Sequence, residues 1–195
     1  MRLILVKSGQ TLWDAQSRLE SVAGTPLTDD GRAYAHRVAG ELAGKGVKVV
    51  YASAGESQQQ TAEILGESLH ARVRVVEDLV GMNYGLWQGL LIAELKRRHM
   101  RTYKQFMEAP GSICPPEGET LGQAQERLEA AMRAIARRHA RGCAALVLRG
   151  VMVSLAMVLL EGRTLEEPWK QLDPSFSWVD LEVSSSLALT ARTRE

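Results

Sequence analysis

The sequence predicts an α/β fold in which helices cover both faces of a mostly parallel β-sheet. Short apolar runs occupy residues 3–6, 47–51 and 144–148, and a strand buried on both faces of a parallel sheet is typically such a run. Between these runs, apolar residues recur at steps of three and four, which is the period of a helix that packs on one side. Strands and helices that alternate in this way build a parallel sheet through right-handed crossovers.

The first half of the chain supplies strands and helices in alternation. Residues 3–6 form the first strand, which ends at a turn. A helix begins after the N-cap Thr28, whose first turn carries two aspartates, and ends before Gly44. The elements that follow are a strand at 47–51, a helix at 60–69 and a β-rich run at 73–76. Ligands of such sheets bind beyond the carboxyl ends of the strands, so the turns that follow them are the candidate site.

The second half adds an insertion and completes the sheet. Residues 79–116 are rich in Gly, Met, Trp and Pro and show no period, so we expect an irregular insertion at about 79–120 that covers one edge of the sheet as a lid. A helix at 121–139, the strand at 144–148, a turn and a buried helix follow. The alternating tail at 179–190 predicts a last pair of strands.

The composition is that of an ordinary globular domain. The chain has 195 residues and two cysteines, with 24 Lys and Arg against 23 Asp and Glu, for a net charge of +1. Balanced charge gives no basic field for nucleic acid or for a membrane surface. Arg149 interrupts the apolar stretch at 143–160, and an arginine at mid-bilayer costs about 2.5–3.5 kcal/mol. Because the cysteines lack metal or disulfide spacing, we expect one cytoplasmic domain over residues 1–195, with no metal, cofactor, nucleic-acid partner or membrane.

Several segments, in order along the chain, resemble motifs of the histidine phosphatase superfamily, in its phosphoglycerate-mutase-like branch. The motifs are Arg-His-Gly-x-Thr-x-Trp-Asn, Pro-Leu-Thr-x-x-Gly, a helix after the second strand, Gly-x-Trp-Glu-Gly and Pro-x-Gly-Glu-Ser-Leu. The similar segments lie at residues 7–14, 26–31, 60–65, 85–89 and 116–121. The resemblance implies a three-layer α/β/α sandwich, phosphomonoester hydrolysis or phosphoglycerate mutation as the reaction, and a homodimer as the assembly.

The residues that carry the family's chemistry are replaced here. The resemblance implies a histidine nucleophile, two arginines and a second histidine around the phosphoryl group, and a glutamate acid. The residues at these positions are Ser8 for the nucleophile, Lys7 and Ser57 for the arginines, Arg149 for the second histidine and Gly81 for the acid. Because none of the catalytic positions is intact, the sequence predicts that the chain is not an enzyme but an inactive member of the family.

Two cations remain at these positions, so we expect the pocket to bind phosphate, sulfate or a phosphorylated small molecule. Lys7 and Arg149 contribute +2, less one if Asp14 faces inward. The N–H groups after Ser8 are also expected to face an anion. The residues predicted to bind the anion are Lys7, Ser8, Gly9, Thr11, Arg149 and Gly150, with Asp14, Glu119 and Thr120 at the rim.

Other interpretations of the same residues stay open. The chain acts as a phosphatase if Ser8 is the nucleophile, but a serine hydroxyl needs a nearby base, and none of the four histidines is predicted in the pocket. Arg149 closes the pocket if it pairs with Asp14 or Glu119. Thr120 caps a helix if it is not at the rim. Alternatively, the domain is a regulatory module that binds a protein partner.

Overall fold

The computed structural model describes residues 1–20, 24–109, 114–139, 141–162, 176–184 and 186–193. It contains one six-stranded sheet with the order β3-β2-β4-β1-β5-β6. The strands are β1 (Arg2–Lys7), β2 (Val49–Ala52), β3 (Arg72–Val75), β4 (Cys143–Leu148), β5 (Trp178–Val183) and β6 (Leu189–Thr193). The first four are mutually parallel, and β5 and β6 extend the sheet in antiparallel fashion beyond β1. The predicted α/β fold with a mostly parallel sheet is confirmed.

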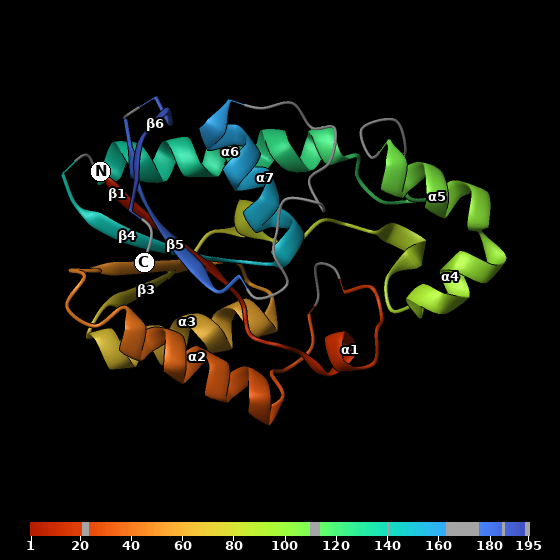
Figure 1. Cartoon of the computed structure of the whole chain (residues 1–195), viewed down its shortest axis with the longest axis horizontal. Coiled ribbons are helices and arrows are strands. Elements are labelled where there is room, and N and C mark those ends of the chain that lie inside the picture. Colours follow the sequence, from red (N-terminus) through yellow and green to blue (C-terminus); the bar gives the residue numbers. More distant parts are fainter. Residues whose placement is uncertain (21–23, 110–113, 140, 163–175, 185, 194–195) are drawn as a thin grey trace.

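Helices cover both faces of this sheet (Figure 1). One face carries α2 (Asp29–Glu41) and α3 (Glu56–Leu69), and the other carries α6 (Leu121–Arg138) and α7 (Gly150–Glu161). The side chains of β1 alternate between the two layers, as the period of a strand requires. Ile4 and Val6 join the core of α2 and α3, whereas Leu3 and Leu5 join the core of α6 and α7. Both faces of β1 are therefore buried, which explains its continuous apolar run.

The segment predicted to be irregular contains two helices, so that prediction is wrong in detail. After two 3-10 turns at Glu77–Leu79 and Gly85–Trp87, the chain forms α4 (Ile92–Arg98) and α5 (Met100–Glu108). Phe106 of α5 is buried and meets Tyr84 and Trp87 edge to face, with ring centroids 6.2 and 5.6 Å apart. These contacts join residues about 20 positions apart, and a local pattern does not reveal them. That the segment moves as a lid stays a prediction.

Two helix starts, those of α1 and α7, position residues of the candidate site. The short helix α1 (Leu12–Ala15) begins at Thr11 with a capping box that Asp14 completes. The buried helix α7 begins directly after β4, with Arg149 as its N-cap. Across the described part of the chain, no helix has the length and apolar character needed to cross a bilayer.

Candidate functional site

A cavity of about 690 Å³ opens at the carboxyl ends of β1 and β4. Its polar and charged lining residues are Lys7, Ser8, Gln10, Asp14, Arg18, Glu20, Asp30, Arg37, Arg149 and Ser177. Leu19, Met82, Tyr84, Ile92, Val151 and Phe176 form an apolar wall. A space of this size holds a phosphoryl group together with an organic substituent.

Ser8 is held at the floor of this cavity by the sheet. It follows β1, and its backbone N–H donates to the carbonyl of Leu148 at 2.9 Å. Its side chain is buried, and no group among the described residues accepts or donates a hydrogen bond to Oγ. Because Ser8 lines the cavity, its hydroxyl is available to a water or a ligand that enters there.

Lys7 lies beside Ser8 at the end of β1 and lines the same cavity. Burial lowers the pKa of Lys7 below its ordinary value, and the positive charge of Arg149 lowers it further, while Asp14 acts in the opposite direction. At a given pH, Lys7 therefore loses its proton more readily than a lysine in water does.

Arg149 is bound within the protein by a carboxylate fork. Its Nη1 donates to Oδ2 of Asp14 at 3.0 Å, and its Nη2 donates to Oδ1 at 2.6 Å. Burial would lower the pKa of Arg149, but the hydrogen bonds and charge of Asp14, together with Glu20, outweigh burial and raise it. For Asp14, burial would raise the pKa, and the hydrogen bonds and charge of Arg149 lower it. Both side chains are therefore charged at neutral pH.

A second carboxylate, Glu20, lies beneath this pair. Its side chain is fully buried, and one oxygen is 3.7 Å from Nη2 of Arg149. Glu20 accepts hydrogen bonds from the hydroxyl of Thr11 and, at 2.8 Å, from the backbone N–H of Thr25. Glu20 lies in a loop without a period or a motif, so no sequence pattern indicates its role. Among the described residues, four cationic side chains and three carboxylates line the cavity, so this part of the lining carries a net +1.

The structure brings together five of the predicted residues, Lys7, Ser8, Asp14, Arg149 and Gly150, along one cavity. Gly9 and Thr11 do not line it, and the expectation that their N–H groups face an anion is wrong. The N–H of Gly9 donates to Thr61 Oγ1 at 3.1 Å, and that of Thr11 donates to Asp14 Oδ2 at 3.0 Å. Both donors are already used within the protein.

The other predicted positions also lie outside the cavity. Ser57 is buried at the start of α3, where its hydroxyl donates to Gln58 at 2.9 Å. The carbonyl of Gly81 and the carboxylate of Glu119 both accept hydrogen bonds from Arg127 of α6, at 2.9 and 2.7 Å. Thr120 is the N-cap of α6, as its alternative interpretation held. Glu119 thus braces the segment before α6 and does not reach Arg149.

The histidines of the chain lie away from this cavity. None of the four histidines is among its lining residues. The described residues also contain no group of three or more His, Cys, Asp and Glu side chains placed to hold a metal ion. The described lining of the cavity offers a hydroxyl, an amine, guanidinium groups and carboxylates.

Comparison with known proteins gives a consistent family. The model of the histidine phosphatase superfamily (branch 1) matches residues 3–188. Phosphoserine phosphatase 1 of Hydrogenobacter thermophilus is 22% identical over 169 residues, which cover 87% of this chain and 80% of that protein. The probable phosphoglycerate mutase GpmB of Yersinia pestis is 27% identical over 190 residues, which cover 96% of this chain and 88% of that protein.

Solved structures share the fold. YhfR of Bacillus stearothermophilus superposes with a TM-score of 0.89 at 24% identity, covering 96% of this chain and 93% of that one. The α-ribazole phosphatase from Shigella flexneri superposes with a TM-score of 0.85 at 22% identity, covering 98% and 95%.

The names of the relatives overturn one expectation. The prediction that the chain is not an enzyme is contradicted, because the relatives that it matches over most of their length are named as a phosphatase and a mutase. That prediction rested on the loss of one set of side chains. The cavity nevertheless keeps a buried hydroxyl, a lysine with a lowered pKa and a guanidinium.

Proposed function

The chain belongs to the histidine phosphatase superfamily (branch 1), and on that premise we propose that it hydrolyses a phosphomonoester in the cavity at the carboxyl ends of β1 and β4, with Ser8 as the nucleophile. One observation carries the proposal: Ser8 Oγ is buried without a hydrogen-bond partner in a cavity that two cations, Lys7 and Arg149, also line. Phosphoryl transfer depends mainly on positioning and on charge stabilisation, which these groups supply.

Lys7 is the proposed base: it lines the same cavity as Ser8, and we propose that substrate binding brings its amine within hydrogen-bond reach of Ser8 Oγ, as in a serine–lysine pair. The neutral amine takes the proton of Ser8 as Oγ bonds to phosphorus, and the bond from phosphorus to the ester oxygen breaks. The ammonium then gives this proton to the departing alkoxide. In the second half, a water whose proton passes through Lys7 to Ser8 attacks the phosphoserine, and inorganic phosphate leaves. The net reaction consumes one water and yields an alcohol and phosphate.

Arg149 is proposed to stabilise the charge on the phosphoryl oxygens. Asp14 occupies two of the five N–H groups of its guanidinium. The remaining groups are available to a phosphate that enters beside Asp14, or to one that displaces it. The apolar wall that includes Met82 and Tyr84 is proposed to take the organic part of the ester. An aryl phosphate is therefore a suited probe.

Hydrolysis of p-nitrophenyl phosphate by the wild-type protein and by Ser8→Ala tests the proposal. We expect turnover by the wild type and its loss in Ser8→Ala, while inorganic phosphate still raises the melting temperature of the variant. Ser57→Ala is the matched control, because it removes another buried serine hydroxyl that does not line the cavity. It should keep the wild-type rate. Equal rates for the wild type and Ser8→Ala, or a wild type that binds phosphate without turnover, would overturn the proposal.

The pH profile tests Lys7 separately. Because burial and Arg149 lower the pKa of Lys7, the rate should rise with pH and level off below pH of about 10.4, the ordinary value for lysine. Lys7→Arg keeps the charge but cannot lose its proton in this range, so its profile should lack the rise. A Lys7→Arg variant with the wild-type profile would show that another group is the base.

A further inference from the structure

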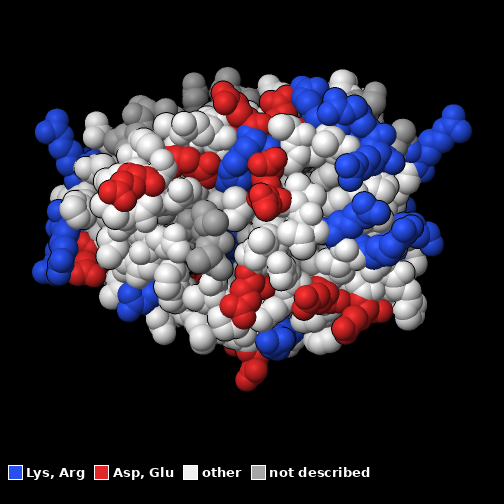
Figure 2. Space-filling model, turned by 180° about the vertical axis from the view of Figure 1, so that it is seen from behind, with Lys and Arg blue, Asp and Glu red and all other residues white. Residues whose placement is uncertain are grey.

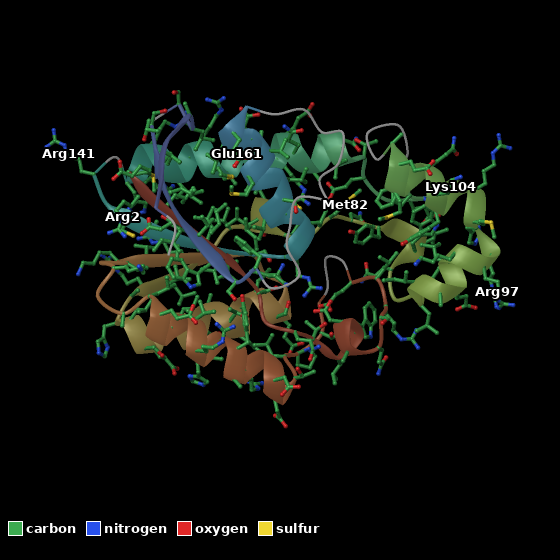
Figure 3. All side chains as sticks on the ribbon, viewed as in Figure 1. Arg2, Met82, Arg97, Lys104, Arg141 and Glu161 are labelled. Carbon is green, nitrogen blue, oxygen red and sulfur yellow. The ribbon has the colours of Figure 1, made fainter. Side chains whose placement is uncertain are left out.

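A second hollow, of about 610 Å³, lies at the amino ends of β1 and β4, at the opposite end of the sheet from the first cavity. We call it the amino-end cleft. It is lined by Met1, Arg2, Lys45, Gly46, Lys48, Arg141, Gly142, Cys143, Glu182, Val183 and Thr190. Figure 3 shows Arg2 and Arg141 at this end of the molecule, far from Arg97 and Lys104 at the other. Four cationic side chains and one carboxylate, Glu182, line the cleft.

Two of the four cations are fixed parts of its wall. Arg2 makes an ion pair with Asp180 and donates from Nη1 to the carbonyl of Lys45 at 2.9 Å. The ammonium of Lys45 lies 4.8 Å from the centre of the Trp178 ring. These contacts hold Arg2 and Lys45 in place and use much of their binding capacity inside the protein.

The other two cations are open. Lys48 and Arg141 are exposed at the mouth of the cleft. Across the described ranges, neither side chain takes part in any ion pair or hydrogen bond that fixes it. The two glycines beside them, Gly46 and Gly142, carry no side chain that would narrow the space between them. Both cations are therefore accessible to a ligand in the cleft.

Further arginines continue this charge along the surface. Arg72 and Arg74 are exposed on the edge strand β3, and the N–H of Arg72 donates to the carbonyl of Lys48 at 3.1 Å. Arg74 and Arg138 both lie near His139. The Nε2 atom of His139 is 2.9 Å from the hydroxyl of Tyr51, with which it makes a hydrogen bond. Figure 2, seen from behind, shows Lys and Arg gathered at this end of the molecule, on the right of the view. The cleft thus opens onto a basic surface.

We propose that the amino-end cleft binds a small polyanion with two or more linked phosphate groups. The open pair Lys48 and Arg141 matches one phosphate, and the arginines of β3 lie beyond it, where a second linked phosphate would extend. Linked phosphates place several charges within a few ångströms, whereas an acidic peptide spreads one charge per side chain. The fork of arginine also suits phosphate oxygens. A hollow of this size accommodates such a molecule.

Calorimetry with tripolyphosphate at low salt tests this site. The wild type should bind, and the double variant Lys48→Ala/Arg141→Ala should bind at least about tenfold more weakly, because two charge-assisted contacts are lost. The matched control is Arg97→Ala/Arg101→Ala, which removes two exposed arginines at the far end of the molecule. It should keep the wild-type affinity.

Three outcomes would overturn the proposal. One is an equal loss in the control double variant, which would show a general effect of charge. Another is a loss in Arg149→Ala alone, which would place the ligand in the first cavity. The third is a polyglutamate peptide that binds this cleft more tightly than tripolyphosphate. Because Ser8 hydrolysis is measured on a different ligand and cavity, either proposal fails independently of the other.

Discussion

The two hollows lie at opposite ends of one sheet and differ in how their cations are neutralised. At the carboxyl end, four cations face three carboxylates, and Arg149 is bonded to Asp14 and lies close to Glu20. At the amino end, four cations face one carboxylate, and two of them are open. A chain with a net charge of +1 thus holds one internally compensated site and one uncompensated site. The pairing of a cation, more than the total charge, decides what it can bind.

We expect the largest effect from removing Glu20, the buried carboxylate beneath Arg149 in the first cavity. In Glu20→Ala, the Thr11 hydroxyl and the Thr25 N–H lose their acceptor, and Arg149 loses a nearby charge. We expect the free energy of unfolding to fall by about 3 kcal/mol, which urea denaturation measures. Glu129→Ala is the control, since Glu129 pairs with Arg133 on the surface of α6 and should contribute less than about 0.5 kcal/mol. Equal effects of the two variants would show that Glu20 is not a buried anchor.

The second largest effect should come from removing the carboxylate charge that pairs with Arg149 in the first cavity. Asp14→Asn keeps an acceptor for the Thr11 N–H but removes the charge that holds Arg149. The affinity for inorganic phosphate should rise about tenfold, because the anion no longer competes with a carboxylate. Calorimetry on Asp14→Asn and on Glu182→Gln separates the two ends, since only the first variant should change phosphate binding in the first cavity. Unchanged or weaker binding by Asp14→Asn would mean that Asp14 does not compete with the ligand.

The pH dependence of stability should reveal the contribution of the Asp14–Arg149 ion pair. The pKa of Asp14 is lowered in the folded protein, so its contribution is present above the unfolded value of about 3.9 and is lost as the pH falls below it. Between pH 6 and 3 the wild type should therefore lose about 1 kcal/mol more stability than Asp14→Asn. Denaturation curves at several pH values measure this difference. Parallel curves for the two proteins would argue that the Arg149 pair adds no stability.

Much of the fold was predictable, whereas only part of the site was. Local sequence patterns predict the buried strands, by their apolar runs, and helices such as α6, by their helical period. Lys7 ends β1, and Ser8 and Arg149 directly follow β1 and β4, whose carboxyl ends meet, so their proximity was predictable too. Glu20 was not, because a loop residue gains its role from tertiary contacts alone. The amino-end cleft gathers residues from five separate segments of the chain, from Met1 to Thr190, and no local pattern links them.

We expect the smallest effect from removing the negative charge of Glu182 in the amino-end cleft. Among the described residues, Glu182 is the one carboxylate in the lining of the amino-end cleft, and it is exposed on β5. Water screens an exposed charge, so Glu182→Gln should strengthen tripolyphosphate binding only about two- to threefold at low salt. The gain should shrink as salt is added, whereas a gain that came from altered packing would not. An increase in affinity that is independent of ionic strength would therefore contradict a cleft in which unpaired charge does the binding.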